Sequence, residues 1–462
     1  MRPSLMRDRL ARLVAGAVYD GADTAAAVET AGFNLAVTHR PAVVIAASSA
    51  ADVKAAVRFA NIEGLSVAVQ ATGHGAAQAS HCTVFVSTKH MQGVTVDPIA
   101  RVARVDAGVR WRNVIDAAVP HGLAPLSGSS SSVGVVGYTL GGGMGHLARR
   151  HGFAADHVRS IDMVDAAGEL RTVTAASDPE LFWGLRGGQG RFGIVTALEF
   201  DLIPTARFFG GAMIFTGPAI ERVLRAFAEW APTMPEEVTT SVALLRLPDS
   251  EQVPPPLRRV VSLALRFGLT GSPEWGKALL QPMRQVAAPV LDSIGAMSYA
   301  AVDRIHMDPT EPLPAITRGG LLHSMPEGLV DTLLEMAGPD VDIPLTVVEI
   351  RLMGGALSRP AHVPNAVAGR EGAYSLVAVA PAPPPMADLA QLVTAQLLAA
   401  AEPWSPGTSL VNFAGHGGES ELSRAWTPAT LQRLIQLKET IDPRNVFGGR
   451  LAAPALLTVG AR

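Results

Sequence analysis

The feature that most limits how this chain can fold is a glycine-rich run at residues 127–145. The run holds seven glycines, and fixing a glycine in a folded interior costs more conformational entropy than fixing any other residue. Such a cost is expected where backbone must lie flat against a large planar ligand. A flexible linker is the alternative, but the apolar residues Val135, Val136 and Leu140 interrupt the run, which favours a buried segment.

A second loop of small residues, 71–77, follows a short strand predicted at residues 66–70. Successive backbone N–H groups in such a loop can form an anion-binding nest that suits a pyrophosphate. His74 is the one reactive side chain in the loop, although an isolated loop histidine more often makes ordinary hydrogen bonds. Neither the loop nor the glycine-rich run matches a phosphate-binding motif of fixed spacing, because G-x-x-x-x-G-K-[ST] is missing and residues 141–145 do not fit G-x-G-x-x-G.

Alternating and helical patterns predict regular elements along the whole chain. In the first two hundred residues, strands are expected at 43–48, 66–70, 83–87, 93–97, 101–107 and 194–203, a hairpin at 161–173, and helices after Ser49 and at 111–121. From about residue 208, helical patterns at 218–230, 273–286 and 386–401 alternate with strands at 240–247, 258–267, 345–353 and 373–380. This second part suggests an α+β module whose antiparallel sheet carries helices on one face.

Composition narrows the functional classes. The 38 basic and 41 acidic residues give a net charge of −3, which offers no electrostatic support for nucleic acid or an anionic membrane as a partner. The single cysteine, Cys82, rules out an intrachain disulfide and a cysteine-based metal cage, and no metal site is expected. The uncharged run 117–148 is broken by Pro120 and Pro125, which disfavours a membrane span, and the start lacks a signal-peptide pattern. A cytoplasmic protein is expected.

Several short motifs occur in one order along the chain. They are R-P-A-V-V from Arg40, G-H-G from Gly73, the glycine-rich run, L-F-W-G-L-R-G-G from Leu181 and R-F-G-I-V-T from Arg191. This ordered set resembles the FAD-binding domain of the vanillyl-alcohol oxidase superfamily, specifically its berberine bridge enzyme-like branch with the bacterial hydroxynicotine oxidase-type members. The closing segments 410–413 and 438–447 are similar to that branch as well. The likeness covers nearly the whole chain, and it lies in the ordered set, since each motif alone is weak.

The resemblance implies an α+β fold of the vanillyl-alcohol oxidase type. An FAD-binding domain split between residues 1–205 and 406–462 would enclose an inserted substrate domain at residues 206–405. The insert would be an α+β unit with an antiparallel sheet covered by helices.

The resemblance also implies a covalent cofactor. His74 stands where the family attaches FAD, and Ser130 stands where many members have a cysteine, so a second, cysteinyl bond is not expected. Asn445 lies in the closing motif. The full set of implied FAD-binding residues is Ala71, Thr72, Gly73, His74, Gly75, Ala76, Gln78, Ser130, Val133, Gly134, Gly137, Tyr138, Gly141, Gly142, Gly143, Gly145, His146, Gly193, Ile194, Val195 and Asn445.

Candidate catalytic residues come from the strand at 345–353. Alternation places Glu349 and Arg351 on one face, where the resemblance puts the substrate, so Glu349 is a candidate general base and Arg351 a partner for an oxyanion or a carboxylate. A plain Glu349–Arg351 ion pair is an equally good reading. Tyr138 and His416 are further candidates, and His416 has a structural role as its alternative.

The function expected from the resemblance is an FAD-dependent oxidase. A small substrate, hydrophobic or of natural-product type and so of secondary metabolism, would pass a hydride to flavin N5, and O2 would reoxidise the flavin to give H2O2. A flavin-containing cyclase or isomerase without net oxidation is the main alternative, since the chain has Leu410 and Trp426 where relatives often have tyrosine. A flavin-free binding protein is the remaining one. The sequence does not indicate an oligomeric state.

Overall fold

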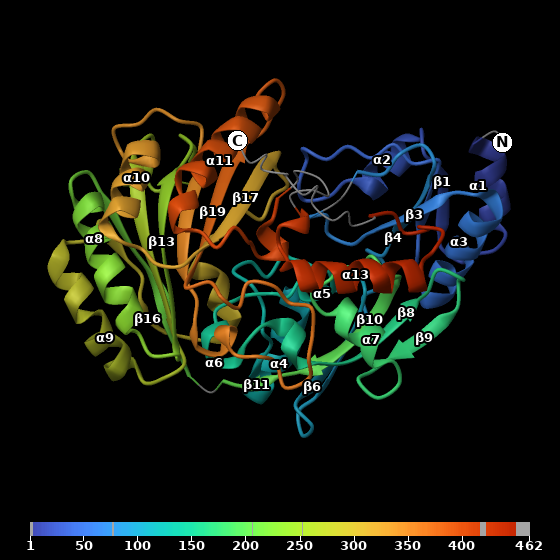
Figure 1. Ribbon diagram of the computed structural model, residues 1–462, viewed down its shortest axis with the longest axis horizontal. Coiled ribbons are helices and arrows are strands. Elements are labelled where there is room, and N and C mark those ends of the chain that lie inside the picture. Colours follow the sequence, from blue (N-terminus) through green and yellow to red (C-terminus); the bar gives the residue numbers. More distant parts are fainter. Residues whose placement is uncertain (1–2, 76–77, 206, 252, 416–421, 450–462) are drawn as a thin grey trace, which may run out of the picture.

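The computed structural model describes residues 3–75, 78–205, 207–251, 253–415 and 422–449. Two bodies with separate hydrophobic cores lie next to each other (Figure 1). The first body is built from the N-terminal two hundred residues together with the C-terminal helix, and the second from the residues between them.

A four-stranded sheet with the order β1-β2-β4-β3 begins the first body. Strands β2, β4 and β3 are parallel, and β1 runs antiparallel to β2. Its strands are β1 (Ala17–Asp20), β2 (Val43–Ala46), β3 (Ser66–Gln70) and β4 (Thr83–Ser87), and its helices are α1 (Pro3–Ala11), α2 (Thr24–Thr30) and α3 (Ala50–Glu63). Helix α3 begins after Ser49, whose side chain accepts a hydrogen bond from the backbone N–H of Asp52, and ends at Gly64 with φ at +69°.

A five-stranded antiparallel sheet with the order β5-β6-β10-β8-β9 completes the first body. Its strands are β5 (Val94–Asp97), β6 (Val102–Asp106), β8 (Val158–Val164), β9 (Leu170–Val173) and β10 (Ile194–Asp201), and two short strands, β7 (Leu123–Ala124) and β11 (Ile203–Pro204), pair beside it. The helices are α4 (Trp111–Ala118), α5 (Val135–Leu140), α6 (Ala148–His151) and α7 (Pro179–Leu185).

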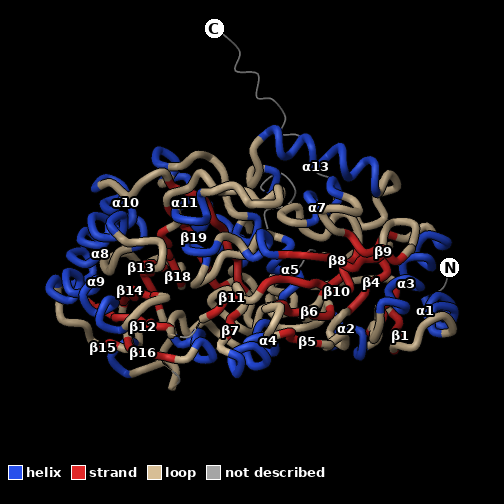
Figure 2. The backbone as a smooth tube through the Cα atoms, turned by 90° about the horizontal axis from the view of Figure 1, so that it is seen from below, coloured by secondary structure: helices blue, strands red, loops and turns tan. Residues whose placement is uncertain are grey.

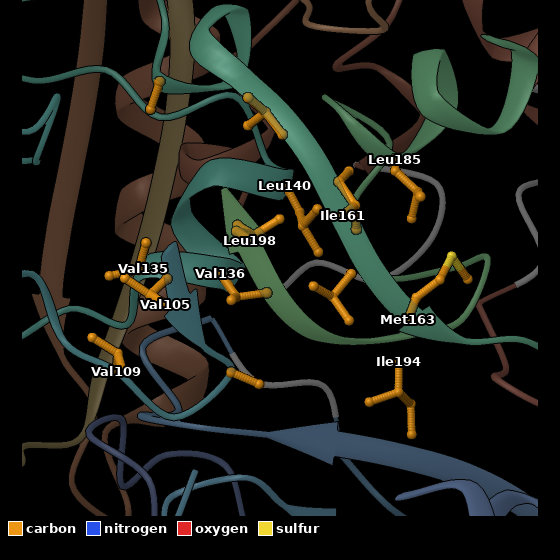
Figure 3. Close-up of a cluster of buried hydrophobic side chains, with 14 of the residues drawn as sticks. Val105, Val109, Val135, Val136, Leu140, Ile161, Met163, Leu185, Ile194 and Leu198 are labelled. Carbon is orange, nitrogen blue, oxygen red and sulfur yellow. The ribbon is translucent and has the colours of Figure 1, made fainter. Parts of the chain in front are cut away.

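Helix α5 lies inside the glycine-rich run and anchors it to this sheet. Figure 3 shows Val135, Val136 and Leu140 of α5 among side chains of β6, β8 and β10, including Val105, Ile161 and Leu198. Val135 is fully buried, and Val136 and Leu140 are nearly so. The run is therefore a fixed part of the core and not a linker, because burying these side chains stabilises one position of the helix.

The second body is an eight-stranded antiparallel sheet with the order β15-β12-β14-β13-β18-β19-β17, and β16 pairs with β12. Its strands are β12 (Phe208–Thr216), β13 (Val238–Arg246), β14 (Val261–Leu269), β15 (Leu291–Asp292), β16 (Gly295–Met297), β17 (Ala315–Leu322), β18 (Val347–Leu352) and β19 (Tyr374–Pro381). Helices α8 (Ala219–Trp230), α9 (Pro273–Val286), α10 (Glu327–Ala337) and α11 (Ala387–Ala400) gather on the outer face of the sheet (Figure 1).

Strand alternation separates an apolar face from a polar one in this sheet. In β18, Val348 and Ile350 belong to the core under the helices, whereas Glu349 and Arg351 point to the opposite face. That opposite face is turned toward the first body, since the charge of Arg351 acts on His146, which directly follows the glycine-rich run. The helix-covered antiparallel sheet predicted from the sequence is confirmed.

The chain returns to the first body through helix α13 (Pro428–Ile441). Figure 2 shows α13 beside α7, and the side chain of Lys438 donates a hydrogen bond to the backbone oxygen of Arg191 at 2.7 Å. The backbone N–H of Val67 in β3 also bonds to the oxygen of Val446 at 2.7 Å. Sequence patterns placed most strands and helices well, but residues 194–203 are not one strand, because β10 ends at Asp201 and β11 is separate.

Candidate functional site

The loop after β3 holds His74 in a fixed position. Gly73 adopts φ +70°, and a Cβ there would come within 2.5 Å of the Gly32 backbone, so only glycine fits. The His74 ring stacks on Phe33 with centroids 4.1 Å apart, and its Nδ1 lies 3.0 Å from Thr72 Oγ1. Burial, helped by the charge of Arg110, lowers the pKa of His74 to about 4. The imidazole is therefore neutral near pH 7 and has an available lone pair.

The glycine-rich run meets this loop at the start of α5. The backbone N–H of Gly134 donates to Thr72 Oγ1 at 3.2 Å, and Ser132 Oγ lies 3.5 Å from His74 Nε2. One turn further, Gly137 is exposed, and a Cβ built on it would meet nothing within 4 Å. Gly137 therefore marks open space beside the His74 loop.

The later glycines of the run allow the chain to pack closely on itself. A Cβ on Gly141 would overlap Asn412, one on Gly143 would come within 2.4 Å of the Tyr138 ring, and one on Gly145 would overlap the backbone oxygen of Ser127. Gly142 packs similarly near Val367, and Gly143 adopts φ +77°. A Cβ at each of these glycines would point toward other protein atoms and not toward open space. That they lie along a planar ligand therefore stays a prediction.

The serines before α5 are fixed by a segment of the second body that includes the 3-10 helix η5 (Tyr299–Arg304). Ser131 donates to Asp303 through its backbone N–H at 2.8 Å and through its hydroxyl at 2.6 Å. Ser129 donates to Asp308 at 2.6 Å, and Ser130 Oγ lies 2.8 Å from Ser132 Oγ. The loop beside His74 is therefore held by both bodies.

A buried polar cluster lies on the inner face of the second sheet. Glu349 Oε1 accepts hydrogen bonds from Ser241 at 2.7 Å, Arg266 at 2.8 Å and His306 at 3.1 Å. Its Oε2 accepts one from Arg351 at 3.0 Å. The sheet order brings β14, β13 and β18 together, so residues distant in sequence share one site. Each of these side chains is at least nine-tenths buried.

The electrostatics of this cluster argue against Glu349 as a general base. Burial alone would raise the pKa of Glu349, but Arg351, Arg266 and His306 hold it well below its usual value. A carboxylate that is already ionised and has four hydrogen-bond donors is a poor proton acceptor. These contacts favour the alternative of a structural ion pair, in which Glu349 orients the two arginines and His306, and the base role stays a prediction.

Three buried polar atoms near this cluster have no hydrogen-bond partner among the described residues. They are the hydroxyl of Tyr138, Nε2 of His146 and Nδ1 of His306. The rings of His146 and His306 lie 4.9 Å apart, so two of these atoms belong to one pair of imidazoles. Burial lowers the pKa of His306 to about 4 and keeps that of His146 well below its usual value. Both rings are neutral near pH 7, and the three unpartnered atoms can each bond to a water or a ligand.

The remaining predicted residues are distributed unevenly around this site. Gln78 is exposed and donates to the backbone oxygen of Thr38 at 2.9 Å. Gly193 packs against β8, and Ile194 and Val195 are 1% and 4% exposed in the core, so their place near the nucleotide end of the cofactor stays a prediction. Val133 is half-buried before α5.

Asn445 is the last of the predicted cofactor-binding residues along the chain. The buried side-chain oxygen of Asn445 has no partner among the described residues. His416 and Ala76 lie outside the described residues.

Sequence reasoning missed His306, Arg266 and the serine contacts of Asp303. Arg266 had a usable signal, because it alternates with the apolar residues Leu265 and Phe267 in its predicted strand. His306 had none, since it follows η5 in an irregular segment without periodicity.

Comparison with known proteins supports FAD binding by the first body. A family model described as an FAD binding domain matches residues 41–174, which include the His74 loop and the glycine-rich run. An FAD-dependent monooxygenase of Fusarium proliferatum is 33% identical over 208 residues, which are 44% of this chain and 40% of that protein. The chain thus matches less than half of that relative's length.

Two further comparisons extend along the chain. The (R)-6-hydroxynicotine oxidase of Paenarthrobacter nicotinovorans is 24% identical over 439 residues, 88% of this chain and 90% of that protein. The crystal structure of 6-hydroxy-D-nicotine oxidase from Arthrobacter nicotinovorans superposes with a TM-score of 0.83 at 22% identity, covering 95% of this chain and 98% of that one. The structural likeness establishes the fold.

None of the described helices combines the length and apolar character that a membrane crossing demands. Within the described ranges, no three His, Cys, Asp or Glu side chains come together as a candidate metal site.

Proposed function

Because this chain belongs to the FAD-linked oxidoreductases of the vanillyl-alcohol oxidase and berberine bridge enzyme superfamily, we propose that it is an oxidase with FAD bound covalently through His74. FAD, when bound, would accept a hydride at N5 from a small hydrophobic or natural-product substrate and pass the electrons to O2, giving H2O2. The observation that carries the proposal is a neutral, half-buried His74 whose loop adjoins the helix with open space at Gly137.

The residues present fit the cofactor. His74 offers an uncharged imidazole, which is the form that can act as a nucleophile toward the flavin methyl group. Exposed Gly137 leaves room for a planar ring, and the His74 loop has small neighbours that admit a pyrophosphate. Ser130 has a hydroxyl bonded to Ser132, so we propose a single covalent attachment and no cysteinyl bond.

The domain division follows from the same proposal. Residues 1–205 and 406–462 would bind FAD, and residues 206–405 would bind the substrate. Two contacts support this division. The closing segment bonds to β3 and to Arg191, and the inserted sheet presents its polar face toward the first body.

On the substrate side, the side chains of the buried cluster determine which groups can accept or donate a proton. His306 Nδ1 is the candidate acceptor, because no described group bonds to it when the ring proton sits on Nε2, 3.1 Å from Glu349. Glu349 remains ionised throughout and keeps Arg351 in place. The Tyr138 hydroxyl, whose pKa burial raises well above its usual value, stays protonated and can donate a hydrogen bond to the substrate.

Acid denaturation tests the covalent attachment. The wild-type pellet should be yellow and fluorescent, His74→Ala should lose the colour, and His121→Ala, an exposed histidine outside the loop, should keep it. A colourless wild-type pellet would contradict the attachment.

Anaerobic mixing with a substrate tests the redox reaction. The substrate should bleach the flavin absorbance, and air should restore that absorbance and produce H2O2, whereas turnover without bleaching would favour the cyclase or isomerase alternative.

A further inference from the structure

The polar cluster on the inner sheet face carries more positive than negative charge. Arg266 and Arg351 both bond to Glu349, and the two neighbouring histidines are neutral near pH 7. Among the described residues, no second carboxylate forms an ion pair with either arginine. The cluster therefore has a net charge of about +1. Its two arginines, Arg266 and Arg351, are only 5% and 6% exposed. An uncompensated buried charge is costly unless an opposite charge joins it.

Both guanidinium groups keep N–H donors that Glu349 does not use. Arg351 donates to Glu349 through Nη2, which also lies 2.9 Å from His306 Nε2, and Arg266 donates to Glu349 through Nη1 alone. No hydrogen bond occupies their other nitrogens within the described part of the chain, and these nitrogens are not sealed off from solvent. An arginine with free N–H groups can bind a second carboxylate, because its planar fork presents several donors.

The neighbours of the arginines on the sheet leave room for such a partner. Ser241 lies opposite both arginines, Ala212 lies on the other side of Arg266, and Ser375 lies on the other side of Arg351. All three have short side chains, so the paired strand neighbours themselves do not cover the guanidinium groups. Tyr138, from the first body, lies close enough for the charge of Arg351 to act on its hydroxyl.

We propose that Arg266 and Arg351 bind an anionic oxygen of the substrate, so that the enzyme takes small organic acids and not amines. The inference rests on the proposed function for the position of the substrate. Glu349 holds the two arginines at a fixed separation, and the substrate anion completes their charge balance. A cationic amine would meet a positive site and would be repelled.

Three probes of equal size test the charge preference. Benzoate, benzamide and benzylamine would each be titrated at pH 7.5 into the purified protein, with binding measured by calorimetry and, separately, by change in the flavin spectrum. Benzoate should bind roughly ten- to a hundred-fold more tightly than benzamide, and benzylamine should not bind measurably. Equal or better binding of benzamide or benzylamine, or binding of none of the three, would overturn the proposal.

Matched variants locate the effect. Arg266→Gln and Arg351→Gln should each weaken benzoate at least roughly ten-fold and leave benzamide unchanged. Arg284→Gln, which removes a surface arginine of α9 paired with Asp292, should change none of the three affinities. If a variant fails to fold, the order of the three probes on the wild type still decides.

The two proposals can fail separately. A colourless protein that prefers benzoate by calorimetry would contradict the oxidase and keep the anion site. A yellow protein that prefers benzylamine would keep the flavin proposal and contradict the anion site.

Discussion

Glu349 shows how partners decide the role of a single side chain. The same carboxylate placed alone in an apolar cavity would have a raised pKa and could act as a base. Here two guanidinium groups and an imidazole surround it, and its pKa falls well below the usual value. Removing the carboxylate would leave two buried cations without a partner, which is why Glu349 is better regarded as the anchor of the arginines than as the reacting group.

His306 gives a pH dependence whose sign can be worked out. Burial lowers its folded pKa to about 4, while the unfolded chain has an ordinary value near 6.5. Between these values the unfolded state binds the extra proton, so stability is complete above the unfolded pKa and falls as the pH drops toward 4. From pH 7 to pH 5 the loss should be about 2 kcal/mol.

Urea unfolding of wild type and His306→Gln at these two pH values measures the effect. The variant should lose less unfolding free energy on acidification, by about that amount. His90→Gln, whose side chain is half exposed, serves as the control and should follow the wild type. Identical acid losses in wild type and His306→Gln would show that His306 does not titrate as described.

In helix α5, one substitution should weaken cofactor binding without lowering the stability of the fold. Gly137 is exposed on α5 with open space at its Cβ position, so Gly137→Leu should leave the free energy of unfolding unchanged or slightly higher. The same leucine would fill the space proposed for the flavin ring, and bound flavin should fall by at least roughly ten-fold, since there is no room for both.

Flavin absorbance per protein, with a melting curve for each variant, tests this. Gly295→Leu adds the same side chain in β16, where a Cβ also meets nothing within 4 Å, and should retain flavin. A yellow Gly137→Leu protein would place the cofactor elsewhere.

The elements also show how far sequence reasoning extends. Helix α3 could be predicted from its Ser49 cap and Gly64 end, and α9 begins and ends at the predicted residues, because these signals are local. Alternation likewise placed Glu349 and Arg351 on one face. Their partners Arg266 and His306 could not be paired with them, because contact depends on sheet order and on an irregular segment that no periodicity describes.

For the whole molecule, the contact between the two bodies passes through η5. Tyr299 and Val302 belong to the hydrophobic core of the first body although they come from the second. The hydroxyl of Tyr299 lies 3.0 Å from Ser127 Oγ and donates to the backbone oxygen of Pro125 at 3.1 Å. One short segment thus fixes the serine loop beside His74 and leads directly to His306, which ties the proposed cofactor loop to the substrate-side cluster.

Asp303 is the residue at which this junction can be tested. It accepts two hydrogen bonds from Ser131 and one from Arg112 at 2.6 Å, all charge-assisted and partly buried. Asp303→Asn should lower the apparent free energy of unfolding by about 1–2 kcal/mol, because the neutral amide weakens all three bonds. Asp116→Asn removes the exposed partner of the same Arg112, an ion pair at 3.3 Å, and should cost under about 0.5 kcal/mol. Chemical unfolding of both variants beside the wild type measures the difference, and equal losses in the two would show that the contact between the bodies at Asp303 contributes no more than a surface ion pair.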